Sequence, residues 1–267
     1  MSDLKHSPAS GQLTALVLAG DRSRKDPLLA HSGKPSKALI EIGGRAMVLR
    51  VLDTLASADF ISGVRLSGPE RNYVEECSEL VSRIETGELV WVPPEATPST
   101  SAHAIVSALP EEERVLLTTA DHPLLTPQIV NEFSEKSLAS GADVVVGLAP
   151  YSLVSEAFPE LKKTVLNFSD QQYCGCNLFA FLTPTGRQMA TIWREVETQR
   201  KTPRKVLSLL GIVSVLRYRF GWLSLDAALR SVSRRLGIKV AAVVLEQPEA
   251  AVDVDSVADH AALQARI

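Results

Sequence analysis

Short apolar runs alternate with segments of helical spacing along the first half of the chain. Residues 13–19 are apolar except for one threonine, which is typical of a strand buried on both faces. In residues 47–57 apolar side chains recur three and four positions apart, which predicts an amphipathic helix. The pattern next predicts strands at 63–67, 89–92, 114–119 and 142–148, and helices at 70–86, 101–109 and 126–140. This alternation predicts βαβ units and a mainly parallel sheet.

The second half of the chain is less regular. Its pattern predicts strands at 173–181 and 240–245, helices at 185–201 and 223–236, and a short helix after Asp255. We therefore expect one domain over residues 13–267 with a three-layer α/β/α, Rossmann-like fold and a mainly parallel central sheet. A helical insertion at about 185–236 and a flexible polar tail at 1–12 complete this prediction.

Composition narrows the class of protein. The chain has 267 residues, of which 45% are hydrophobic and 22% charged, as in an ordinary globular protein. The net charge of −3 argues against a general nucleic-acid binder. Cys77, Cys174 and Cys176 are too few for a disulfide framework, which favours a cytoplasmic location, and the lone C-x-C is a weak metal signal.

A glycine turn after the first predicted strand is the first candidate site. Gly20 ends the apolar run, so several backbone N–H groups are exposed at one point, and nearby arginines and Lys37 add positive charge. Such a turn can hold a chain of phosphates. The alternative is a glycine needed only for turn geometry, with solvated arginines. The residues of this candidate phosphate site are Leu18, Ala19, Gly20, Asp21, Arg22, Ser23 and Arg24.

Three aspartates are candidate metal ligands. Asp121 follows the strand 114–119, and a proline two residues later stops the ladder. Mg²⁺ takes one or two protein carboxylates and completes its shell with phosphates and water. Alternation places Asp253 and Asp255 on one face of a short extended segment near the C-terminus. The alternative for Asp121 is a turn residue, and for Asp255 a helix cap.

The order and spacing of these features resemble a known family. Residues 13–57 resemble L-A-G-G-x-[SG]-x-R followed by K-x-L-x-x-[IV]-G-G, with Lys37 opening the second part. Residues 114–125 contain the D-x-P segment, and residues 250–263 resemble N-x-D-[TS]-P-x-D-L. These motifs are similar to those of MobA-like NTP transferases, which include molybdenum-cofactor guanylyltransferases. The resemblance implies a GT-A-like fold and transfer of a nucleotide with the help of Mg²⁺.

The resemblance also implies roles for single residues. Arg24 would neutralise the leaving pyrophosphate, and Lys37 would hold the α-phosphate. Asp121 and Asp255 would bind Mg²⁺, with Asp253 as a further candidate ligand. Ser101 would lie near the base or ribose, and Asn177 near the acceptor. Arg24, Lys37 and Asp121 are therefore the predicted catalytic residues.

Departures from the family pattern and basic residues outside it bear on the substrates. Asp21 stands where the family has a second glycine, Val257 replaces a proline, and Asp253 an asparagine. Lys163 belongs to a group of basic residues that would meet a phosphorylated acceptor, and a solvated surface is the alternative. The apolar segment 206–216 with basic flanks is either a core helix or a surface for an apolar or lipid ligand.

The resulting hypothesis is an Mg²⁺-dependent nucleotidyltransferase. It would move a nucleoside monophosphate from an NTP to a phosphorylated small-molecule or lipid-phosphate acceptor and release pyrophosphate. The expected partners are the NTP and the acceptor, with peripheral membrane contact left open and no nucleic acid, and the protein would be a monomer or homodimer. Two alternatives remain at this point: a glycosyltransferase that uses a nucleotide-sugar, and a nucleotide-binding protein without catalysis.

Overall fold

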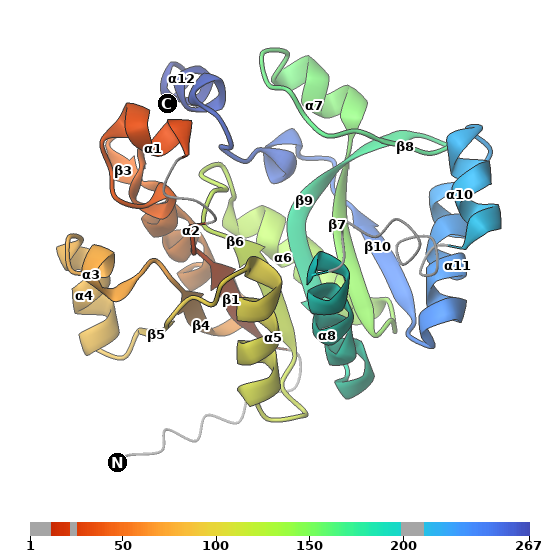
Figure 1. Ribbon diagram of the computed structural model, residues 1–267, viewed down its shortest axis with the longest axis horizontal. Coiled ribbons are helices and arrows are strands. Elements are labelled where there is room, and N and C mark those ends of the chain that lie inside the picture. The colour runs from red at the N-terminus through yellow and green to blue at the C-terminus, as the bar shows by residue number, and fades with distance from the viewer. Residues whose placement is uncertain (1–11, 22–25, 199–210) are drawn as a thin grey trace.

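A central sheet of eight strands carries helices on both faces in the computed structural model, which describes residues 12–21, 26–198 and 211–267 (Figure 1). The strands are β1 (Leu13–Leu18), β4 (Ile61–Ser67), β5 (Leu89–Val92), β6 (Val115–Thr119), β7 (Val144–Pro150), β8 (Leu166–Asn167), β9 (Gln172–Phe181) and β10 (Val240–Val244). Their order is β10-β7-β9-β6-β1-β4-β5, and β8 pairs with β9. A separate hairpin joins β2 (Glu41–Ile42) to β3 (Arg45–Ala46).

The main sheet is mostly parallel, as predicted. β1 pairs in parallel with β4 and β6, β4 with β5, and β7 with β10. β9 lies between β6 and β7 and is antiparallel to both. The start of β9 therefore lies at the carboxyl ends of the parallel strands, which is where open α/β sheets bind ligands.

Helices form the two outer layers. They are α1 (Pro27–Ser32), α2 (Met47–Ala56), α3 (Arg71–Val74), α4 (Ser78–Glu85), α5 (Pro98–Ala108), α6 (Pro127–Ala139), α7 (Tyr151–Ala157), α8 (Pro184–Thr198), α10 (Ile212–Arg219), α11 (Leu225–Leu236) and α12 (Val257–Gln264), with 3₁₀ turns η1 (Lys37–Leu39) and η2 (Pro248–Ala251). In the part of the chain that the structure describes, none of these helices combines the length and the apolar character that crossing a membrane would require.

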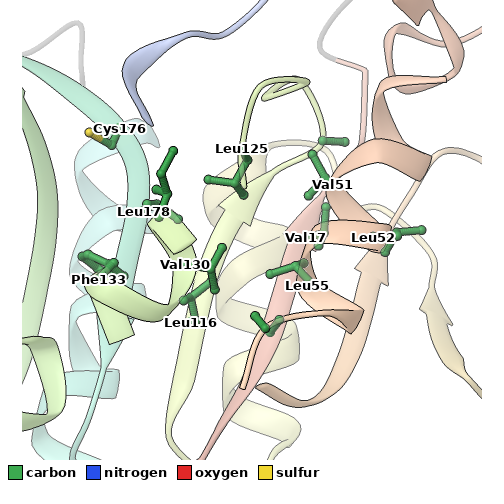
Figure 2. Close-up of a cluster of buried hydrophobic side chains, with 14 of the residues drawn as sticks. Val17, Val51, Leu52, Leu55, Leu116, Leu125, Val130, Phe133, Cys176 and Leu178 are labelled. Carbon is green, nitrogen blue, oxygen red and sulfur yellow. The ribbon is translucent and has the colours of Figure 1, made fainter. Parts of the chain in front are cut away.

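Side chains of β1 alternate between two apolar cores. Leu13, Ala15 and Val17 face the core that α2 and α6 complete, which Figure 2 shows around Val17, Leu55 and Phe133. Leu16 and Leu18 point to the other face and pack with residues of α5 and α8. Because both faces are covered, the uninterrupted apolar character of this strand is explained.

The predicted helix 70–86 is wrong in one respect, because the structure forms two helices there. The chain is extended at Cys77, between α3 and α4. Val74 and Leu80 are both fully buried. In one continuous helix these residues would lie about 120° apart around the axis, and the break between α3 and α4 lets both enter the core.

Other elements also differ from the sequence prediction. Helix α5 begins at Pro98 rather than 101, because Thr97 caps it through a reciprocal bond with Thr100. Helix α7 and the short strand β8 were not predicted. The predicted helix 185–201 is described only to residue 198, and the tail 1–12 is described only at residue 12.

A third apolar cluster lies under the carboxyl edge of the sheet and joins segments far apart in the sequence. It contains Ile40 and Met47 near η1, Phe158 after α7, and Val252 and Val254 near the C-terminus, all buried. Figure 1 shows α1 and α12 close together above this edge. This cluster therefore fixes the Lys37 segment against the segment that carries Asp253 and Asp255.

Candidate functional site

The ends of the parallel strands bring the predicted site residues together. Gly20 follows β1, and Asp121 follows β6, its immediate neighbour in the sheet. The amide of Val254 donates to the carbonyl of Asp121 at 3.0 Å, which attaches the C-terminal segment to the same edge. Val254 is buried, so Asp253 and Asp255 on either side of it lie off that apolar face, as the alternation predicts.

Lys37 joins two of the predicted metal ligands. Its Nζ lies 2.6 Å from Asp121 Oδ2 and 2.6 Å from Asp255 Oδ1. The hydroxyl of Thr119 donates to the other oxygen of Asp121 at 2.5 Å. The side chain of Asp255 is 70% exposed, whereas that of Asp121 is 20% exposed. The structure thus places one ammonium group between two carboxylates at the edge of the sheet.

The charges in this bridge shift the titration of both partners. Burial alone would raise the pKa of Asp121, but the Lys37 ammonium outweighs it and holds that pKa below its usual value. Burial alone would lower the pKa of Lys37, but Asp121 and Asp255 raise it well above its usual value. Lys37 and Asp121 therefore each favour the charged form of the other.

The acid stability of the protein should depend on this bridge. A carboxyl whose pKa is lowered on folding stabilises the native state above the unfolded pKa of about 4, and this contribution is lost as pH falls through the native pKa. We expect the free energy of unfolding to decrease below pH 4, and Asp121→Asn to make that decrease less steep. Urea unfolding between pH 6 and 2.5 measures both. Equal slopes for wild type and variant would contradict the assignment.

Asp21 does not face the phosphate cradle with a free carboxylate. Its Oδ1 accepts a hydrogen bond from the backbone amide of Lys37 at 2.9 Å. The residue that departs from the family pattern therefore fixes the start of η1, and with it the position of Lys37. This contact removes part of the repulsion that a carboxylate beside a triphosphate would cause.

Gly20 has the exposure and the tight surroundings expected of a cradle. A Cβ atom at this position would lie 3.1 Å from Pro94 Cβ. Its amide donates to no group within the described ranges, and the residue is exposed. Arg22, Ser23 and Arg24, which the sequence places next in this turn, lie outside the described residues, so their roles stay predictions.

Two cavities extend from this turn toward the β4–β5 side. Ser101 lies in the first turn of α5, is buried, and accepts the amide hydrogen of Glu95 at 2.8 Å. It lines a small cavity together with Leu18, Gly20, Asp21, Ser67 and Glu95. A second cavity of about 550 Å³ shares Asp21 and Glu95 and is lined also by Arg71, Tyr73 and Trp91. The predicted nucleotide residue Ser101 thus lies beside the cradle.

A second polar cluster contains the two residues predicted to bind the acceptor. The side chain of Lys163 is 8% exposed and forms a close ion pair with Asp253. Asn177 Nδ2 lies 3.2 Å from Asp253 Oδ2 and 2.9 Å from His122 Nε2. We call His122, Lys163, Asn177 and Asp253 the acceptor cluster. Asp253, the third candidate metal ligand, belongs to this cluster, and no contact joins it to Lys37 among the described contacts.

Asn177 lies where the β9 ladder is interrupted. Val146 pairs with Phe179 and Leu148 with Gly175, so Gly147 alone faces the three residues between. Asn177 has φ +47°, the left-handed region that non-glycine residues other than asparagine and aspartate rarely adopt. Bulges of this kind redirect a side chain and are common beside active sites.

His122 is a residue whose role sequence reasoning missed. It follows Asp121 directly, but it is 1% exposed and its ring faces Asn177. Burial holds its pKa below the usual range, so an unprotonated Nε2 accepts the Asn177 amide hydrogen. Its position next to an aspartate at a strand end was the available signal. The two clusters therefore adjoin through the dipeptide Asp121–His122.

The donor set suits a magnesium ion held by two carboxylates. Within the described ranges no three His, Cys, Asp or Glu side chains gather around one point. The Lys37 nitrogen nevertheless lies 2.6 Å from one oxygen of Asp121 and 2.6 Å from one oxygen of Asp255, so both carboxylates face the same position. Mg²⁺ commonly takes one or two protein carboxylates and receives its other ligands from phosphates and water. The residues present therefore fit this ion.

Helix α12 resolves the alternative for Asp255. Its N-cap is Ser256, whose hydroxyl accepts the Asp259 amide hydrogen at 3.2 Å. Asp255 instead pairs with Lys37. The Asp255 side chain therefore does not cap α12.

The solved structures that this chain resembles include three that cover nearly all of it. A hypothetical transferase from Thermus thermophilus is 28% identical, with a TM-score of 0.77 over 93% of this chain and 99% of that one. A CMP:2-keto-3-deoxy-manno-octonic acid synthetase in complex with CTP is 11% identical, with a TM-score of 0.60 over 96% and 98%. A 4-diphosphocytidyl-2C-methyl-D-erythritol synthase from Anaerococcus prevotii is 13% identical, with a TM-score of 0.56 over 96% of each chain.

The sequence itself matches one family profile. The profile described as the MobA-like NTP transferase domain matches residues 15–162, more than half of the chain. The comparison of this chain with curated proteins found no match. The profile begins in β1 and ends just before Lys163, so it includes Gly20, Lys37 and Asp121 but not Asn177 or Asp255.

Proposed function

Because the chain belongs to the MobA-like NTP transferase domain family, we propose that it transfers a nucleoside monophosphate from an NTP to a phosphorylated acceptor and releases pyrophosphate. The observation that carries the proposal is the position of Lys37 between Asp121 and Asp255, at the sheet edge where Gly20 is also exposed. A cation site and a phosphate cradle at one sheet edge are what nucleotidyl transfer requires of a protein.

In this proposal the triphosphate lies along the glycine turn. The Gly20 amide donates to a phosphate oxygen, and the base and ribose extend toward the cavities that Ser101 and Trp91 line. Arg24 keeps its sequence-based role of neutralising the pyrophosphate. The acceptor phosphate attacks the α-phosphorus, the bond to the β-phosphate oxygen breaks, and pyrophosphate leaves.

Asp121 and Asp255 would hold Mg²⁺, which supplies charge neutralisation to the phosphates when it is bound. Lys37 then pairs with the α-phosphate in place of the carboxylates. The hydrogen bond that the Lys37 backbone amide donates to Asp21 Oδ1 holds the backbone, so only the lysine side chain has to move. The ammonium stabilises the negative charge that the acceptor brings to the α-phosphate.

The acceptor cluster is the proposed location of the second substrate. Lys163 is the cation of this cluster and pairs with one oxygen of Asp253, and the side-chain amide of Asn177 contacts the other oxygen. A phosphate group on the acceptor would share Lys163 with Asp253 or replace that carboxylate as its partner. Because His122 directly follows Asp121 and contacts Asn177, the two proposed substrate sites adjoin, which supports transfer between them.

The test is a pair of measurements on the full chain. Thermal unfolding with ATP, CTP, GTP or UTP and Mg²⁺ should show one NTP raising the midpoint by several degrees, since a ligand of the native state stabilises it. Pyrophosphate release with that NTP should then require a phosphorylated sugar, polyol or prenyl acceptor.

The outcome separates the alternatives. Binding of a nucleotide-sugar and transfer of its sugar, without pyrophosphate release, would show a glycosyltransferase instead. Tight NTP binding without turnover across the whole acceptor set would show a nucleotide-binding protein. Either result would overturn the proposal.

A further inference from the structure

Exposed apolar side chains gather on one short segment at the far end of the sheet from β5. Seven large apolar side chains are exposed within the described ranges, and five of them lie between residues 213 and 222. They are Val213, Leu216, Tyr218, Phe220 and Trp222. Phe220 is 60% exposed and Trp222 68%. Of the apolar segment 206–216 the structure describes residues 211–216, and there Val213 and Leu216 lie on the surface.

Arginines accompany these side chains. Arg217 and Arg219 lie on the same helix, and neither forms an ion pair with a residue that the structure describes. The sequence has no aspartate or glutamate from Gly211 to Leu225, although the whole chain has a net charge of −3. We call Val213, Leu216, Phe220 and Trp222, with Arg217 and Arg219, the α10 surface.

A cavity beside the α10 surface adds more positive charge. It has a volume of about 500 Å³ and lies between α10 and α11. Arg217, Arg230, Arg234 and Arg235 line it. Arg230 also pairs with Asp226 on its own helix. Several guanidinium groups around one cavity suit an anionic group such as a phosphate.

The segment is attached firmly to the body of the protein, so its exposure is not that of a loose end. The Asn167 amide donates to Tyr218 Oη at 3.1 Å, and the Ser169 amide to the carbonyl of Leu223 at 2.9 Å. Phe220 and Trp222 stack with ring centroids 5.4 Å apart. Figure 1 shows α10 beside β8, at the end of the sheet that α11 covers. The aromatic pair is thus presented outward on a fixed support.

We propose that the α10 surface docks on a bilayer that contains anionic phospholipids. Stacked aromatic rings and aliphatic side chains enter the headgroup boundary, where tryptophan is favoured, and arginines contact lipid phosphates. Charge complementarity selects this occupant, because the surface and its cavity contain arginines while the chain as a whole is acidic. The inference stands apart from the proposed function and does not need it to be correct.

Vesicle flotation of the full chain tests the proposal. We expect binding to vesicles of phosphatidylcholine mixed with phosphatidylglycerol and little binding to phosphatidylcholine alone. Binding should weaken at high salt because the charges are exposed. The double substitutions Phe220→Ser with Trp222→Ser, and Arg217→Gln with Arg219→Gln, should each weaken binding roughly tenfold or more.

Two controls match these substitutions. Val90→Ser removes an apolar side chain that is 46% exposed on β5, and Lys136→Gln removes an exposed cation on α6. Both should bind vesicles as the wild type does. The chain has three tryptophans, so brominated lipid should quench emission in the wild type and less in Trp222→Phe.

Three results would overturn the proposal. These are no binding to either kind of vesicle, equal binding to both, or unchanged binding of both double variants that unfold at the wild-type midpoint. Self-association that the Phe220 and Trp222 substitutions abolish, with no vesicle binding, would assign the α10 surface to a dimer contact instead.

Discussion

We expect Asp121→Asn to lower kcat/KM for pyrophosphate release by roughly a thousandfold or more. Asp121 is the less exposed of the two carboxylates at the Lys37 nitrogen, and Thr119 fixes its orientation. The asparagine keeps the size and the Thr119 contact but removes the charge that a cation needs. Steady-state kinetics over a range of Mg²⁺ concentrations measures the loss, which a higher Mg²⁺ concentration should restore only in part.

Two further variants are compared with Asp121→Asn, one with a smaller expected effect and one with none. Asp255→Asn should have a smaller effect, about tenfold, because its side chain is 70% exposed and water can replace it more easily. Asp59→Asn alters an exposed aspartate that accepts from Asn131 and precedes β4, at the opposite edge of the sheet. It should leave kcat/KM unchanged. Wild-type activity in Asp121→Asn would refute the assignment of this residue.

Lys37→Met should have the second largest effect, and it should lower both the stability of the protein and its turnover number. Without the ammonium, Asp121 and Asp255 face each other without a cation, so the free energy of unfolding should fall by about 1–2 kcal/mol, a discounted value because both partners are partly exposed. The turnover number should fall roughly a hundredfold or more, since the α-phosphate loses its cation.

Magnesium distinguishes this explanation from simple loss of stability. In the wild type, Mg²⁺ has to displace Lys37 from the two carboxylates, whereas in Lys37→Met it meets no competitor. The ion alone should therefore raise the unfolding midpoint more in the variant than in the wild type. Lys34→Met is the matched control, because Lys34 also forms an ion pair of 2.6 Å, with Glu41, but away from both aspartates. Equal Mg²⁺ shifts in Lys37→Met and wild type would contradict the proposed exchange.

The pattern of apolar residues predicted the sheet, because the burial of each strand is reflected in its own sequence. β1 is buried on both faces, and its sequence is apolar almost throughout. The alternation of Val252, Asp253, Val254 and Asp255 was equally informative, since the two valines enter the apolar cluster while the aspartates do not. In both segments the pattern of apolar residues fits only one arrangement of buried and exposed side chains, so the sequence sufficed to predict that arrangement.

Long-range contacts were harder to predict, because they depend on which segments the fold brings together. The alternation placed Asp253 and Asp255 on one side, but a difference of two residues directs them to different partners, Lys163 and Lys37. His122 received no role because its contact with Asn177 crosses 55 residues of sequence. Asp21 likewise received no structural role, because its contact with the Lys37 amide crosses 16 residues of sequence.

The position of β9 has a consequence for the order of assembly. β6 and β7 come one after the other in the chain, yet in the described sheet they are connected only through β9, which is made later. Until residues 172–181 insert, β7 has no partner on that side, and this late pairing over long sequence separations is a slow step in folding. Asn177 lies in that same strand, so closure of the sheet and completion of the acceptor cluster are one folding event.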